Sequence, residues 1–168
     1  AETPETLAYT MVNDSQSLFG FRHVALVING RVRAVTGVTV PDPHAPFVAF
    51  IERACKQLMA GQHLQQAATI NAAWLDQQSL HDWQTLSAQE ALWVPLKDRN
   101  GLLIGGLWYA RDQQWQDGER LLAEQLAAAC SHAWLALEPR QTWRPRWPRM
   151  RIIAGIALLL LVMLLPIR

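Results

Sequence analysis

The pattern of apolar and polar residues in the first forty positions predicts a helix followed by a β-hairpin. Residues 5–18 place apolar side chains near one helical face, although polar residues weaken the pattern toward its end. Residues 21–28 hold a continuous apolar run, which is typical of a buried strand. Asn29 and Gly30 then form the strongest two-residue hairpin turn. In the partner strand, 31–38, we expect one face to hold the alternating residues Val32, Ala34, Thr36 and Val38.

The clearest amphipathic helix follows a proline-rich loop. Pro46 suits the first turn of a helix, and Gly61 suits its end. Between them the i, i+3, i+4 spacing predicts a buried stripe of Phe47, Phe50, Ile51, Ala54, Cys55, Leu58 and Met59. The next segment, 62–90, is rich in Gln and weakly patterned, and we expect helical turns over 64–75.

A second hairpin and a long helix complete the predicted domain. Strands over 92–96 and 102–110 flank a turn at Asn100–Gly101, and Pro95 indicates an edge or a bulge. Asp117 caps the final helix, whose predicted buried stripe is Leu122, Leu126, Ala129, Ala133 and Leu137. Hairpins joined by helices predict an α+β fold with an antiparallel sheet and helices packed on it.

Charge divides the chain into an acidic domain and a basic tail. Residues 1–138 carry fourteen acidic and nine basic side chains, a net charge of −5, whereas residues 139–168 carry six Arg and no acid. An acidic domain argues against nucleic acid as a partner, because that affinity depends on neutralising phosphates. We therefore expect a domain at 1–138, a basic linker at 139–151 and a separate segment at 152–168.

The run Ile152–Leu165 predicts a single transmembrane helix. It contains no charged or strongly polar side chain, whereas a buried core helix, the alternative, usually keeps one polar face. About 16 apolar residues in a helix rise roughly 24 Å, less than the roughly 30 Å hydrocarbon core. Arg151 and Arg168 can extend it by reaching toward the headgroups. Its marginal length leads us to expect an interrupted span near the start of a longer protein.

The linker supplies the candidate membrane-interface residues. Trp side chains suit the interface between lipid and water, and Arg side chains suit anionic headgroups. The set predicted to contact the bilayer is Trp143, Arg144, Arg146, Trp147, Arg149 and Arg151. Because basic residues flanking a span tend to stay inside the cell, we expect domain 1–138 to be cytoplasmic.

Catalytic and metal-binding motifs are missing from the sequence. Cys55 and Cys130 are far apart, and Cys55 falls on a predicted buried face, which argues against a nucleophile. The five His residues show no metal-ligand spacing. No phosphate-binding loop or hydrolase elbow occurs, so we expect no enzyme activity and no cofactor. Among the Trp residues, Trp74, Trp83 and Trp93 could line a pocket, but core packing is the favoured interpretation.

The final hairpin and helix resemble those of a GAF domain. The resemblance rests on Val94–Leu96, the turn Asp98–Gly101, Ile104–Leu107 and the helix after Gln116–Glu119, within about 5–138. It implies a small-molecule site between the sheet and its helices. The chain as a whole, with the loop 38–48 and the basic linker before one span, is similar to the N-terminal part of HlyD-type membrane-fusion proteins, the periplasmic adaptors of bacterial export systems.

Three functions follow as hypotheses. The first is a non-catalytic regulatory or assembly domain of an inner-membrane adaptor in a bacterial export or efflux system. It implies the bilayer, a transporter and other adaptor subunits as partners. The alternative is a membrane-attached GAF-type sensor of a small molecule in signalling. A third, an enzyme, would require a reductase acting through Cys55.

Overall fold

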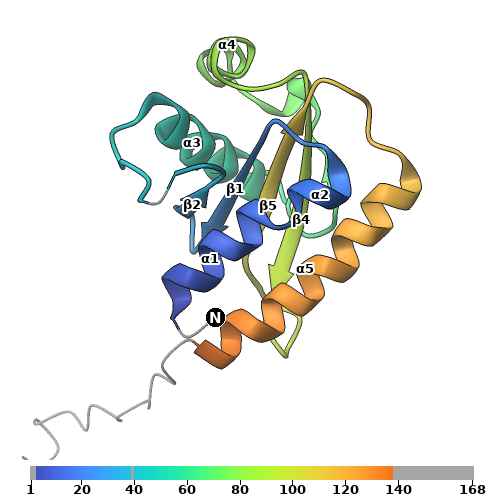
Figure 1. The fold of residues 1–168 in the computed structure, drawn as a ribbon. Helices are drawn as coiled ribbons and strands as arrows, with labels where there is room; N and C mark the ends of the chain where they lie inside the picture. Colours follow the sequence, from blue (N-terminus) through green and yellow to red (C-terminus); the bar gives the residue numbers. More distant parts are fainter. Residues whose placement is uncertain (1–2, 39, 138–168) are drawn as a thin grey trace, which may run out of the picture. The chain divides into compact units, whose positions relative to one another are not determined.

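Five antiparallel strands form one sheet in the computed structural model, which describes residues 3–38 and 40–137 (Figure 1). The strands are β1 (His23–Ile28), β2 (Arg31–Val35), β3 (Ala68–Thr69), β4 (Glu90–Lys97) and β5 (Leu103–Arg111). They lie in the order β2-β1-β5-β4-β3, and each neighbouring pair is antiparallel. The predicted α+β class with an antiparallel sheet is confirmed.

Helices cover both faces of this sheet (Figure 1). On one face lie α1 (Pro4–Asn13), the single-turn α2 (Gln16–Phe19) and α5 (Asp117–Leu137). On the other lie α3 (Pro46–Ala60) and α4 (Gln77–Leu86). Because successive side chains of a strand point to opposite faces, the central strand β5 contributes Leu107 and Tyr109 to the α1/α5 core and Trp108 to the α3/α4 core.

The β1–β2 turn forms as predicted. Asn29 and Gly30 have φ angles of 51° and 75°, the positive values that a two-residue type I′ hairpin requires. Gly has no Cβ to oppose this conformation, and Asn tolerates it better than most residues. This turn sets the strands in register, with Ile28 opposite Arg31.

A β-bulge in the same hairpin overturns one prediction from the alternating pattern. Val27 pairs with Val32 and Leu26 pairs with Ala34, so Arg33 is an extra residue on β2. The extra residue reverses the alternation of side chains at that point. Val32 therefore packs against the α3/α4 core and Ala34 lies in the α1/α5 core. The prediction that they share one face is wrong.

The predicted helix over 5–18 is divided into α1 and α2. α1 ends at Asn13, and α2 begins at Gln16. The Ser15 hydroxyl donates a hydrogen bond of 3.2 Å to the carbonyl of Met11. Such short polar side chains compete with the helical backbone for hydrogen bonds, which explains why the polar stretch interrupts the helix.

Helix α3 forms where the amphipathic pattern predicted it. Pro46 occupies the first turn, where its missing N–H costs no helical hydrogen bond, and Gly61 follows the last residue. Met59 differs from the prediction because it is 40% exposed, and Phe47 is only partly buried. The rest of the predicted stripe is buried, namely Phe50, Ile51, Ala54, Cys55 and Leu58.

The weakly patterned segment follows the prediction only in part. Within 64–75 a 3₁₀ turn forms over Ala72–Trp74, whereas Ala68–Thr69 forms the short strand β3. Asn71 accepts a hydrogen bond from the N–H of Ala73, and Asp76 accepts one from the N–H of Ser79. These side chains cap new turns, so the regular helix, α4, begins only after Asp76.

Helix α5 turns a different stripe to the sheet from the one predicted. Leu122 is 44% exposed and Ala129 is also exposed, while Leu126, Ala133 and Leu137 are only partly buried. The buried residues are Ala123, Ala127, Ser131 and Trp134. Small side chains let a helix approach a sheet closely, so the sheet selects the Ala-rich stripe over the Leu-rich one.

The predicted transmembrane helix over 152–168 lies outside the described residues. None of the helices within 3–38 and 40–137 has the length and apolar character needed to cross a membrane.

The buried guanidinium of Arg111 joins β5 to the start of α5. It forms a bidentate ion pair with Glu119 and donates to the carbonyls of Phe19, Gln113 and Gln114. Glu119 also accepts from the N–H of Gln116, which is one of the two hydrogen bonds of a capping box, at the start of the helix. The hydrogen bonds from Arg111 lower the pKa of the Glu119 carboxyl.

We expect Arg111→Met to lower the free energy of unfolding by about 3 kcal/mol, because it leaves the Glu119 carboxylate and three carbonyls without their donor. Urea denaturation measures the loss. Arg31→Met is the matched control, since Arg31 is 73% exposed and its ion pair with Glu52 should contribute less than about 1 kcal/mol. Equal losses in the two variants would contradict the role assigned to Arg111.

Candidate functional site

Aromatic side chains fill the space between the sheet and the helices α3 and α4. Phe50, Trp93 and Trp108 are each at most 1% exposed. The ring of Trp108 meets Phe50 at 6.0 Å and Trp83 at 6.1 Å, both edge to face. This geometry is favourable for aromatic pairs. Of the two layers between the sheet and its helices, in which the GAF resemblance implies a ligand, this one is therefore occupied at its centre by the protein's own rings.

Trp93 is held in this layer by a glycine and a carbonyl. Its indole N–H donates to the carbonyl of Leu64 at 3.0 Å. Its ring lies over Gly106 on the neighbouring strand, where a Cβ would come within 2.2 Å of the indole. Gly106 therefore serves close packing, and the position admits no larger residue without movement of Trp93.

The other two Trp residues singled out from the sequence have different surroundings. The indole N–H of Trp83 donates to the carbonyl of Ala88 at 2.7 Å, and the residue is 7% exposed. Trp74 is partly buried and stacks on His63 with ring centroids 4.2 Å apart. Core packing is thus confirmed for Trp83 and Trp93, and Trp83 also forms the wall of a cleft.

That cleft, of about 740 Å³, opens at the edge of the sheet between α4 and β3. Its size is typical of small-molecule sites. An apolar floor comes from Ile70, Leu80 and Trp83. The remaining lining residues are small or polar, namely Thr69, Asn71, Ala72, Gln84, Ser87, Ala88, Gln89 and Glu90.

The polar rim of this cleft, which we call the α4 cleft, is mostly uncharged. Glu90 is the one charged side chain among its described lining residues. Side-chain amides can donate or accept, so they suit neutral polar groups. The hydroxyl of Ser87 is buried and has no hydrogen-bond partner within the described part of the chain. An anion would meet no cation here and would lie near the Glu90 carboxylate.

Sequence patterns did not find the α4 cleft, because its polar residues fall in the segment without clear periodicity. One indication was available: several Gln residues, Gln84 and Gln89 among them, surround Trp83 without a helical apolar stripe. The cleft arises only when β3 pairs with β4 and α4 folds over that edge.

The thiols are placed unfavourably for nucleophilic chemistry. Cys55 is 1% exposed, and burial raises its pKa to about 12. Burial likewise raises the pKa of the partly exposed Cys130 to about 11. Since the thiolate is the reactive form, both groups stay protonated near neutral pH. Cys55 lines a small cavity of about 370 Å³ beside Trp93 and Gly105, in the layer between the sheet and α3.

Metal ligands do not converge in the described regions. Within 3–38 and 40–137, no group of three or more His, Cys, Asp or Glu side chains is arranged to hold a metal ion. The predicted membrane-interface residues lie outside the described residues; they are Trp143, Arg144, Arg146, Trp147, Arg149 and Arg151.

The family model of the GAF domain matches residues 3–134, nearly the whole described region. The chain belongs to the GAF domain family. The sheet order and the helices on both faces agree with this assignment, and the resemblance inferred from the final hairpin and helix is confirmed.

Solved GAF structures share this fold at low sequence identity. The GAF domain of a two-component sensor histidine kinase from Bacillus halodurans is 18% identical with a TM-score of 0.51, over 82% of this chain and 95% of that one. A GAF domain/HD domain protein from Geobacter sulfurreducens is 20% identical with a TM-score of 0.59, over 81% and 92%.

The blue-light absorbing form of the PixJ GAF domain from Thermosynechococcus elongatus is 18% identical with a TM-score of 0.57, over 80% of this chain and 86% of that one. No curated protein matches this chain. At these identities the structural likeness establishes the fold alone.

We expect Gly106→Ala to lower the free energy of unfolding by about 1–3 kcal/mol, because the new methyl group would collide with the Trp93 ring. Thermal denaturation followed by Trp fluorescence measures it. Gly118→Ala is the matched control, since a Cβ there meets nothing within 4 Å and Ala favours the helix. A Gly106→Ala variant as stable as the parent would show that the layer is loosely packed.

Proposed function

We propose that this GAF domain is a non-catalytic regulatory module that binds a small molecule in the α4 cleft. The observation that carries the proposal is the cleft itself, with about 740 Å³ of space, an apolar floor and an amide-rich rim. The fold shared with the GAF domain of a sensor histidine kinase and with the light-absorbing PixJ GAF domain supports a sensory role. The resemblance to the family also implies a ligand beside the sheet.

The lining chemistry favours a neutral or cationic ligand with a flat apolar part. The indole of Trp83, backed by Leu80 and Ile70, suits such a surface. The carboxylate of Glu90 attracts a cation, and the amides of Gln84 and Gln89 suit hydrogen-bonding groups. Anionic ligands are disfavoured because no basic side chain is present among the described lining residues.

A binding role without catalysis is supported by the surroundings of the titratable groups. Cys55 and Cys130 have raised pKa values, so neither supplies a thiolate near neutral pH. Glu90 stands in the α4 cleft without a second acid or base beside it among the lining residues. Mechanisms that use two carboxyl groups, as in glycoside hydrolysis, would need such a second group.

Attachment to the bacterial inner membrane is part of the proposal. It rests on the amino-acid sequence, where a domain of net charge −5 precedes a basic segment and then the apolar run Ile152–Leu165. The positive charge before the apolar run favours a cytoplasmic position for the GAF domain.

A second candidate function is a regulatory or assembly domain in an export or efflux adaptor. It is favoured by the similarity of the loop 38–48, the basic linker and the following apolar run to HlyD-type proteins. In that case an inner-membrane transporter and other adaptor subunits would be the partners. A regulatory ligand in the α4 cleft is compatible with either setting.

The α4 cleft should bind tryptamine, a cation with an indole ring, more tightly than indole-3-acetate, which has the same ring and a negative charge. Isothermal titration calorimetry on the purified chain measures both. Gln84→Lys should weaken tryptamine binding about tenfold, because it places a cation in the rim near Glu90. Gln78→Lys is the control, on the same helix but outside the cleft lining. Stronger binding of indole-3-acetate would contradict the proposed charge preference.

A reporter fused before Ala1 should give a cytoplasmic signal in a bacterial host, and the full chain should sediment with membranes. The basic residues before the apolar run determine this orientation. Protease protection in spheroplasts provides the measurement, with a fusion to residues 1–138 alone as the control. A periplasmic reporter would refute the orientation.

A further inference from the structure

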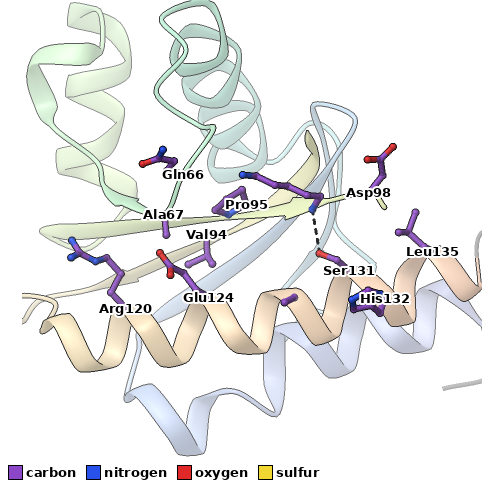
Figure 2. Close-up of a pocket in the computed structure, with 12 residues that line it drawn as sticks. Gln66, Ala67, Val94, Pro95, Asp98, Arg120, Glu124, Ser131, His132 and Leu135 are labelled. Atoms are coloured by element: carbon purple, nitrogen blue, oxygen red, sulfur yellow. Dashed lines mark hydrogen bonds between the residues drawn. The ribbon is translucent and has the colours of Figure 1, made fainter. Parts of the chain in front are cut away.

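A second concave site lies along α5, apart from the α4 cleft (Figure 2). It has a volume of about 710 Å³ and lies between α5 and the edge of β4. Arg120 and Glu124 rise from α5 toward Gln66 on the opposite wall, as Figure 2 shows. We call it the α5 groove. None of its lining residues is shared with the α4 cleft.

The groove exists because Pro95 ends the pairing between β3 and β4. Ala68 pairs with Trp93. Pro95 is the next residue of β4 whose backbone faces the β3 side. Proline has no N–H to donate to a neighbouring strand. The chain before β3 therefore leaves the sheet at Gln66 and Ala67, and no strand of the described residues lies beside the end of β4 on this side.

The exposed edge is nevertheless poorly suited to an added strand. The N–H of Lys97 donates to the hydroxyl of Ser131 at 3.2 Å, and that hydroxyl donates to the carbonyl of Ala127 at 2.8 Å. With Pro95 lacking an N–H and the N–H of Lys97 already used, an added strand would find no donor at these two positions, which disfavours backbone pairing. Recognition in the groove therefore depends mainly on its side chains.

Those side chains carry opposite charges that are not paired with each other. Glu124 and the ammonium of Lys97 have no ion pair within the described part of the chain. Arg120 is paired with Asp117, whose carboxylate side chain is 94% exposed. Such an exposed pair contributes little and exchanges partners easily. The groove thus offers cationic groups and a free carboxylate across one space.

The charges in the groove balance, and apolar side chains lie beside them. Lys97 and Arg120 are offset by Asp98 and Glu124, while Ala67, Pro95, Ala128 and Leu135 supply apolar surface over the buried Val94. A monovalent anion or cation would gain one attraction and meet one repulsion in such a site. A molecule with both a carboxylate and an ammonium group would satisfy both signs at once.

We propose that the α5 groove binds a small zwitterion, an α-amino acid or a short peptide with an apolar side chain. Its carboxylate lies against Lys97 and Arg120, and its ammonium group lies against Glu124. The apolar side chain rests on Ala67 and Pro95, which Figure 2 shows beside Glu124. This site is independent of the α4 cleft, so the domain would respond to two different molecules.

Isothermal titration calorimetry on the purified full chain, with L-leucine and L-alanyl-L-leucine as probes, tests the proposal. Saturable binding of L-leucine, of the dipeptide or of both shows whether the groove accepts free amino acids, short peptides or both. N-acetylation of the bound probe removes its ammonium group, and C-terminal amidation removes its carboxylate. Each change should weaken binding about tenfold or more, because each removes a charge-assisted contact.

Glu124→Gln and Lys97→Gln should each lower the affinity for the unmodified probe by about tenfold, while the melting temperature of the protein stays unchanged. Glu5→Gln, an exposed change on α1, is the control and should leave binding intact. Three results would each overturn the proposal: no saturable binding at millimolar concentration, equal binding of the capped probes, or binding unaffected by Glu124→Gln. The α4 cleft variants leave this site untouched, so the two proposals fail separately.

Discussion

The position of α5 depends on one buried cation. The guanidinium of Arg111 is enclosed where the end of α2, the end of β5 and the start of α5 meet, and it lies 3.9 Å over the ring of Trp115. A buried charge is tolerated only when its donors are satisfied, and here carbonyls and Glu119 satisfy them. The start of the longest helix is therefore fixed by chemistry at the sheet rather than by its own apolar stripe.

From that fixed start, α5 lies along β4 on its smallest side chains. Ala123 and Ala127 are buried, and Ser131 adds a hydrogen bond to the backbone of Lys97. This close contact leaves the charged side chains of the helix at the border of the sheet, where they form the α5 groove. The same placement that stabilises the domain thus creates one of its two candidate sites.

On the opposite face of the sheet, the packing of large aromatic side chains determines where space remains. Trp93, Trp108 and Phe50 occupy its centre, and Gly106 provides the space that Trp93 needs. On this face, the space for a ligand therefore lies at the edge of the sheet, beneath α4. Binding there requires contact with one helix and one short strand, and it leaves the central rings in place.

Local chemistry explains which parts of the fold were predictable. The Asn29–Gly30 turn and α3 follow from residues that act within a few positions of one another. The bulge at Arg33 could not be predicted, because an extra residue in one strand is defined only by its partner strand. The buried stripe of α5 was missed for a similar reason, since its close approach to β4 favours Ala over Leu.

The candidate sites could be predicted from the sequence even less well than the fold. The GAF family was recognisable from the last hairpin and helix, and that implied a ligand beside the sheet. Core packing was correctly assigned to Trp83 and Trp93, because large apolar rings are buried in most environments, although Trp83 also lines the α4 cleft. Neither site has a motif: the α5 groove gathers residues from separate segments of the chain, and the α4 cleft is lined by residues within 69–90, whose pattern is weak.

Pro95 has an effect that extends beyond a single copy of the domain. A free strand edge allows one molecule to pair with the next and so promotes aggregation. Here the end of β4 lacks one donor at Pro95, and its next donor is bound to Ser131. Copies of the domain at high local concentration therefore have little tendency to pair with one another along this edge. The groove beside it stays accessible to solvent.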